Sequence, residues 1–497
     1  MAKRTVSSGL GSLGSGAVTA VALAVQTGLA AVVGVIIARD FGRTAETDGF
    51  FASYGVFIVV VLAATAIRLA VLPPLARARD EERLGSEVAA YATTLGLLAV
   101  PLLAVAVSGS HQLAWLLTGN GPAAARHVAA QTLPWMMFAA VLQLYAGLAA
   151  SALAALDDYV VASAGYALGS ACGLAYIFAR VHSDGIPAVA HGMAVNGAIA
   201  VAVPTVALAI RARGEAMPNS ALRPGGLTFG ARVREIATSV ALPLALQAIY
   251  LICLPLAARV GVGATTSFGY AYLLTSAIVA VTASSLGLVT SVPLTRAGLS
   301  PGAAARHIVA SSWIAVTLIG AAAGVFSIAG ERIVRVLLGP HYGASVGSEL
   351  GRLVVVMSLW AVVAVGVTVT FPLVFVASSG RRLPLLAAGA LAIHVPAAVV
   401  GEVIGGLEGL AVALAATTAV ILLGLLATLG AIGATLRGLG IAAVTAATFA
   451  VAAFVVPWLL LAPVAAAAVG VLVYGVLVAV VRPRGLRTAW RYLHQLS

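Results

Sequence analysis

The sequence predicts an all-α polytopic membrane protein with about fourteen transmembrane helices, arranged as two parallel six-helix lobes plus two extra C-terminal helices. Of the 497 residues, 61% are hydrophobic and only 9% are charged, and the mean hydropathy is +1.08. Soluble domains carry roughly 25% charged residues because they need a charged exterior in water. The apolar residues also fall in runs of about 20, the length that a helix needs to cross the hydrocarbon core.

The apolar runs are separated by connectors that hold most of the charged residues, and these connectors place the ends of the expected spans. The longest connector, 211–235, is too short for a soluble domain and reads as a basic linker. We expect spans at 17–38, 49–72, 88–107, 129–153, 159–179, 185–210, 236–258, 264–292, 304–328, 351–377, 382–404, 408–433, 437–461 and 463–481.

The basic residues indicate the orientation of these spans. With a cytoplasmic N-terminus, most of the 28 Lys and Arg residues fall in the cytoplasmic connectors. The positive-inside rule and an even number of spans therefore predict that both termini are cytoplasmic. The net charge of +12 does not point to nucleic acid, because the basic residues form no patch with interleaved aromatic side chains.

Three landmarks recur in order at an offset close to 220 residues, which indicates an internal repeat. Each half would then be a six-helix lobe in the same orientation. The predicted organisation is an N-terminal lobe at 1–210, a cytoplasmic linker at 211–235, a C-terminal lobe at 236–433, and extra helices with a basic tail at 434–497. The paired landmarks are Arg39 with Arg259, Pro74 with Pro293, and Gly119 with Gly339.

Two parallel lobes create a central cleft that rocking can expose to each side of the membrane in turn. An enzyme would instead need paired carboxylates, a metal cluster or an activated nucleophile. The sequence offers none of these, so we expect a transporter with no catalytic residue, metal ion or cofactor.

Polar residues in and beside the spans are the candidates for gating and substrate contact. Arg68 is the one charge well within a span, where a charge costs about 2.5–3.5 kcal/mol. It either extends to the inner headgroups or contacts an anion in the cleft. The predicted gate and substrate residues are Arg39, Glu46, Asp48, Arg68, Arg259, Gln143, Asn196 and Gln247.

Each of these candidates also has a structural interpretation. Arg39, Glu46 and Asp48 either close an outer gate with ion pairs or form a solvated, salt-bridged turn, and Arg259 fits both. The amides Gln143, Asn196 and Gln247 either contact substrate or form hydrogen bonds between helices, which is their usual role in membranes.

The first outer turn resembles a family signature. Residues 38–42 read ARDFG and residues 46–51 read ETDGFF, which is similar to the turn of MurJ/MviN-type lipid II flippases of the MOP exporter superfamily. Tyr270-Ala271 and 291–294 (SVPL) resemble that family's eighth helix. Of the family's cleft residues, Arg39 and Asp48 match directly, and Arg68 stands near the position of another arginine.

This resemblance implies a flippase that carries a polyprenyl-diphosphate-linked glycan precursor of the cell wall across the bacterial plasma membrane. Its partners would be membrane lipids, the lipid-linked glycan and proteins of envelope synthesis. Three alternatives stay open: a MATE-like antiporter for drugs or metabolites, a membrane polymerase or ligase for polyprenyl-linked glycans, and a non-transporting scaffold of an envelope-synthesis complex.

Overall fold

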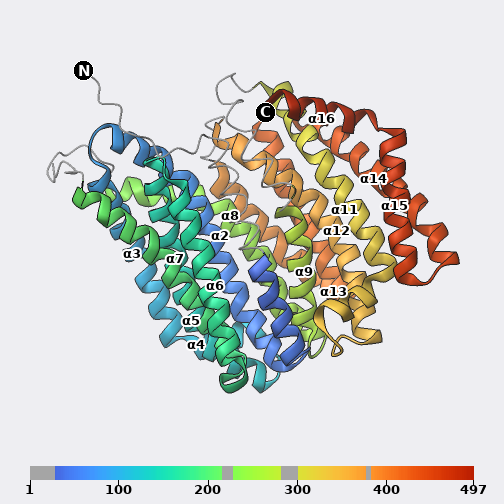
Figure 1. Cartoon of the computed structure of the whole chain (residues 1–497), viewed down its shortest axis with the longest axis horizontal. Helices are drawn as coiled ribbons and strands as arrows, with labels where there is room; N and C mark the ends of the chain where they lie inside the picture. The colour runs from blue at the N-terminus through green and yellow to red at the C-terminus, as the bar shows by residue number, and fades with distance from the viewer. Residues whose placement is uncertain (1–27, 215–227, 281, 283–299, 377–381, 497) are drawn as a thin grey trace. The chain divides into compact units, whose positions relative to one another are not determined.

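The computed structural model describes residues 28–214, 228–280, 282, 300–376 and 382–496 (Figure 1). Several predicted features fall wholly or partly outside these residues: 17–27 of the first span, most of the 211–235 linker, and the later part of the eighth span with the 291–294 motif. All regular structure in the described part of the chain is helical.

The chain is a multi-pass membrane protein, with 11 helices among the described residues that are long and apolar enough to span a membrane. Every predicted span coincides in whole or in part with a helix. The first span corresponds to a helix over 28–41. The others correspond to α2 (Ala45–Asp80), α3 (Leu84–Ser108), α5 (Ala123–Ala155), α6 (Tyr159–Asp184), α7 (Pro187–Gly214), α8 (Phe229–Val260), α9 (Ala264–Val279), α11 (Pro301–Leu338), α12 (Ala344–Val376), α13 (Leu383–Thr428), α14 (Ile432–Leu460) and α15 (Pro463–Val481).

Two predicted spans, 382–404 and 408–433, are joined within α13 by a sharp turn rather than a loop. Gly406 at the turn has φ 53° and ψ −128°, a conformation that favours glycine. Gly401 and Gly409 on either side pack so closely that neither has space for a Cβ. The two halves of α13 are therefore two helices, as the sequence predicts.

The chain divides into two compact units, and the first contains Met1–Ile37, Ser53–Ala114 and Arg126–Leu244. Within it, α6 and α7 pack face to face, as Figure 1 shows. Their contact uses three glycines of α6 spaced four residues apart, an arrangement that lets helix backbones approach closely in lipid. These are Gly165, Gly169 and Gly173.

The second unit contains Ala38–Ala52, Trp115–Ala125 and Ala245–Ser497. In it, α11 packs against α12, α14 and α15, and α12 packs against α9 and α13.

Two short helices were not predicted: α4 (Ser110–Thr118), which continues from α3, and α16 (Arg484–Leu496) in the basic tail. Figure 1 shows α16 lying across the ends of its neighbours. The predicted boundaries of the lobes at 210, 235 and 433 stay predictions.

Candidate functional site

Residues 38–52, which we name the docking segment, pack within the second unit although the chain on both sides belongs to the first. Gly42, with φ +61°, ends the preceding helix. Thr44 and Thr47 then cap each other: the Thr44 N–H donates to Thr47 Oγ1 at 2.9 Å, and the Thr47 N–H donates to Thr44 Oγ1 at 3.3 Å. This reciprocal cap starts α2 and directs Asp48 into the protein.

Asp48 caps the N-terminus of α9. Its Oδ2 accepts a hydrogen bond from the Gly263 N–H at 2.6 Å, and its Oδ1 accepts from the N–H and hydroxyl of Thr266 at 2.8 and 2.7 Å. Gly263, the N-cap residue with φ 81°, has no side chain to do this. The carboxylate, only 5% exposed, therefore satisfies free N–H groups and complements the positive end of the helix dipole.

Arg39 makes the opposite contact at the C-terminus of α11. Its Nη2 donates to the Val336 carbonyl oxygen at 2.9 Å, and its Nε donates to the Leu337 carbonyl oxygen at 3.4 Å. These carbonyls lie in the last turn, where α-helices leave acceptors unpaired and a cation is favourable. The docking segment thus places an anion on one helix end and a cation on another.

An ion pair completes the docking. Arg43 donates to the two carboxylate oxygens of Glu349 at 3.0 and 3.4 Å. A Cβ on Gly263 would overlap the Arg43 side chain, so this glycine serves both the turn and the close approach. The Tyr342 hydroxyl donates to the Gly42 carbonyl at 3.4 Å, and burial raises the pKa of Tyr342 well above its usual value, so this group stays a neutral donor.

Two predicted gate residues lie outside these contacts. Glu46 is exposed on the first turn of α2 and takes part in no ion pair among the described residues. Arg259 is exposed in the last turn of α8. Their part in gating stays a prediction. The acid that pairs with Arg43 of this turn is Glu349 on α12.

Arg68 lies on α2 in the first unit, and its side chain is exposed. Its guanidinium carbon is 5.7 Å from the centroid of the Tyr166 ring on α6, a cation–π distance. Gly147 on α5 permits the approach, because a Cβ there would lie 3.3 Å from Arg68 Cγ. An exposed guanidinium held over an aromatic ring keeps its donors available to an anion.

The three predicted amides have different surroundings. Gln247 is buried on α8, and its Oε1 accepts a hydrogen bond from the Tyr272 hydroxyl at 3.0 Å. Asn196 on α7 lies against Gly169 and Gly173 of α6, which gives it a place in helix packing. Gln143 is buried on α5. Gln247 and Asn196 therefore each contact a neighbouring helix.

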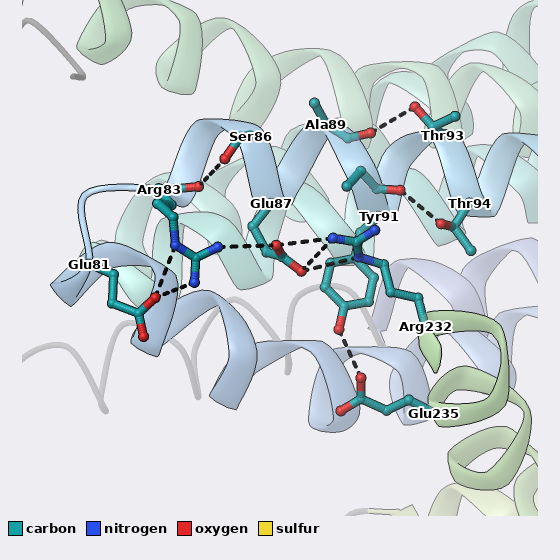
Figure 2. Close-up of polar contacts among 11 residues, drawn as sticks. Glu81, Arg83, Ser86, Glu87, Ala89, Tyr91, Thr93, Thr94, Arg232 and Glu235 are labelled. Carbon is teal, nitrogen blue, oxygen red and sulfur yellow. Dashed lines mark hydrogen bonds and ion pairs between the residues drawn. The ribbon is translucent and has the colours of Figure 1, made fainter. Parts of the chain in front are cut away.

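A buried charge network in the first unit joins α3 to the beginning of α8 (Figure 2). Arg232 Nη2 lies 3.1 Å from both carboxylate oxygens of Glu87, and its Nε is 3.1 Å from one of them. The Tyr91 hydroxyl donates to Glu235 at 3.0 Å, and the Tyr91 ring lies under the Arg232 guanidinium at 5.5 Å. Arg83 adds a second cation at 3.8 Å from Glu87.

Several of these residues were not predicted from the sequence. Gly263, Thr266 and Glu349 contact the docking segment from positions more than 200 residues away. The only sequence sign was that α9 begins without a Ser, Thr, Asp or Asn cap, so that its cap must come from elsewhere. No sequence pattern singled out Glu87 and Arg232 as partners, since each is one of several charged residues in a connector.

Comparison with known proteins places this architecture. No protein-family model and no curated protein sequence matches the chain. Among solved structures, the lipid II flippase MurJ in an inward closed conformation superposes with a TM-score of 0.71 at 11% identity, covering 93% of this chain and 98% of MurJ. The fold is that of the MOP transporters.

Two further structures agree with this fold. An inward-facing MATE multidrug-resistance transporter of the MOP superfamily has a TM-score of 0.65 at 14% identity, covering 86% of this chain and 99% of that one. A MOP superfamily transporter from Pyrococcus furiosus, described by the reversed polarity of its binding pocket, has a TM-score of 0.55 at 14% identity, covering 86% and 95%. The predicted resemblance is confirmed for the fold.

Proposed function

We propose that this protein is an alternating-access flippase that moves a lipid-linked glycan precursor, such as a polyprenyl-diphosphate glycan, across the bacterial plasma membrane. The observation that carries the proposal is the likeness to MurJ over 93% of this chain and 98% of that one. Both termini lie in the cytoplasm in this proposal, and membrane lipids and envelope-synthesis proteins are its partners.

The docking segment is the gate in this mechanism. Hydrogen bonds and one ion pair hold it at the ends of α9 and α11 and at α12, and the buried Phe51 ring packs edge-on against Tyr270 of α9 with centroids 4.9 Å apart. Water can replace the polar contacts one by one, so these can form and break at a modest net free-energy change. The segment would detach from the ends of α9 and α11 when the protein opens outward, and would dock again when it closes.

An apolar groove in the second unit supports a lipid-linked cargo. It has a volume of about 700 Å³ and is lined by α11, α12 and α14. Ile319, Leu359, Phe454 and Trp458 are among its walls. A groove of this chemistry suits a prenyl chain.

A second candidate is an exporter of soluble drugs or metabolites, which the likeness to the MATE transporter favours. The two functions differ in what the cargo needs. A soluble cation does not require an apolar groove for a prenyl chain. A polyprenyl-linked glycan requires binding sites for both its prenyl chain and its diphosphate-linked glycan.

The test is a flipping assay in proteoliposomes that contain lipid II with a fluorophore on its glycan. A membrane-impermeant reductant bleaches only the glycans that face outward, so flipping appears as a second bleaching phase. We expect this phase with the wild-type protein, its loss in Arg39→Ala/Asp48→Ala, and its retention in the surface control Arg180→Ala.

The alternative is tested in the same vesicles with ethidium and an imposed sodium or proton gradient. Ethidium transport without any glycan flipping would replace the flippase proposal by the exporter. If protein that elutes as a single species shows neither activity, the flippase and the exporter are both contradicted and a scaffold role is favoured.

A further inference from the structure

A second cavity, of about 810 Å³, lies where α11, α15 and α16 meet. It shares no lining residue with the apolar groove of the proposed cargo. One wall is apolar and includes Ile314, Leu318 and Val478. The other wall is basic and aromatic, with Arg482, Arg487, Arg491 and Trp490. The cavity therefore joins an apolar surface to a concentrated positive charge.

The structure holds α16 firmly in place beside this cavity. Its inner face packs on α11: Ala489 is fully buried, and a Cβ on Gly485 would overlap the Trp313 ring. The Tyr492 hydroxyl and His307 Nδ1 are 3.2 Å apart. Because one face of α16 is committed to packing, its arginines are left on the opposite, exposed face.

Two of the three arginines, Arg482 and Arg487, are orientated by backbone carbonyls rather than by acids. Arg482, in the left-handed conformation with φ 44°, donates from Nε to the Ala479 carbonyl at 2.8 Å. Arg487 donates from Nε to the Arg482 carbonyl at 2.6 Å. Residues 482–497 contain no Asp or Glu, and no carboxylate forms an ion pair with these arginines within the described parts of the chain.

We propose that this cavity binds an anionic glycerophospholipid. The lipid phosphate would lie on Arg482, Arg487 and Arg491, and the acyl chains would follow the apolar wall of α11 and α15. The position fits, because α16 begins three residues after the membrane helix α15 ends, at the depth of the headgroups. Basic amphipathic helices lie in this interface, and a tryptophan such as Trp490 is a typical anchor there.

The chemistry selects a lipid over a soluble anion. Guanidinium groups bind phosphate strongly, with two parallel N–H···O hydrogen bonds in bidentate geometry. A free phosphate would use the basic wall alone and leave the apolar wall exposed to water, whereas a phospholipid covers both. Basic residues near a membrane attract anionic lipids by roughly fivefold in affinity each. We name this site the α16 lipid site.

The test is native mass spectrometry of the full-length protein in mild detergent, with phosphatidylglycerol and phosphatidylcholine added in equal amounts. We expect the wild type to retain phosphatidylglycerol preferentially. Arg482→Gln/Arg487→Gln/Arg491→Gln should lower its retention roughly 100-fold, and each single substitution roughly fivefold. The single variants keep the test valid if the triple variant folds poorly.

The matched control removes the same charge from the other end of α11 and the start of α12, with Arg332→Gln/Arg335→Gln/Arg352→Gln. Unchanged phosphatidylglycerol retention in this control supports the α16 lipid site. An equal loss in both triple variants, or no preference over phosphatidylcholine in the wild type, would overturn it. The readout is lipid retention, so it does not depend on the transported cargo.

Discussion

The Asp48 carboxylate accepts a hydrogen bond from the backbone N–H of Gly263 at 2.6 Å, although the two residues are 215 positions apart. An acid at the start of one membrane helix thus caps another helix. The cap acts on the end of α9, where the N–H groups have no partner within the helix. A movement or substitution that removes Asp48 therefore leaves the N–H groups of Gly263 and Thr266 without this acceptor.

Neutralising Asp48 should release the start of α9. In Asp48→Asn we expect the amides of Gly263 and Thr266 to exchange with deuterium about 10- to 100-fold faster, since charge-assisted hydrogen bonds contribute about 1.5–3 kcal/mol. Hydrogen–deuterium exchange mass spectrometry of the peptide around 261–268 measures this. The control is Glu46→Gln, whose exposed carboxyl lies two residues away; unchanged exchange in Asp48→Asn would refute the capping role.

A covalent bond between the docking segment and α12 should stop transport if the segment is a gate. With Cys172 and Cys253 replaced by Ala, the two thiols of Arg43→Cys/Glu349→Cys can be joined through reducible disulfides by a short bis-methanethiosulfonate, because the native side chains are in contact. We expect glycan flipping to stop after cross-linking and to return after reduction. Each single-cysteine variant should flip equally well before and after the same treatment; continued flipping by a fully cross-linked protein would exclude gating here.

Removing the Arg68 charge should weaken binding of the proposed cargo. In Arg68→Ala we expect at least tenfold lower retention of a polyprenyl-diphosphate glycan by native mass spectrometry, because a buried diphosphate needs charge-assisted partners. Tyr166→Phe keeps the ring under the guanidinium and should have little effect, whereas Tyr166→Leu removes the ring. Equal cargo retention in Arg68→Ala and wild type would show that the anion binds elsewhere.

The network around Glu87 should matter for stability. Glu87 and Arg232 are only 6% and 11% exposed, and breaking a buried ion pair leaves an unpaired charge that costs about 3–5 kcal/mol. In Arg232→Gln we therefore expect unfolding at clearly lower dodecyl sulfate fractions. Arg180→Gln, which breaks the more exposed pair with Asp184, should change stability by about 0.5 kcal/mol or less. Similar midpoints for both variants would contradict a structural role for the network.

The sequence by itself determined the helices. In lipid every backbone N–H and carbonyl must be paired within the protein, so apolar runs of about 20 residues become helices whatever their neighbours are. The turn inside α13 was predictable for the same reason, because its apolar length exceeds one crossing and Gly405-Gly406 supplies the reversal. The family-like signature at 46–51 predicts a gate role for Asp48, and that role stays a prediction.

The tertiary structure decided which charges meet. No local pattern joins Asp48 to Gly263, Arg39 to Val336, or Arg43 to Glu349, because ion pairs and helix caps between distant segments depend on packing. Packing also separated the candidates: it set Arg39 on the end of α11 and Asp48 on the end of α9, left Glu46 exposed, and placed Arg68 over an aromatic ring. A helix span follows from the chain's own hydrogen bonds, but a site follows from which helices are neighbours.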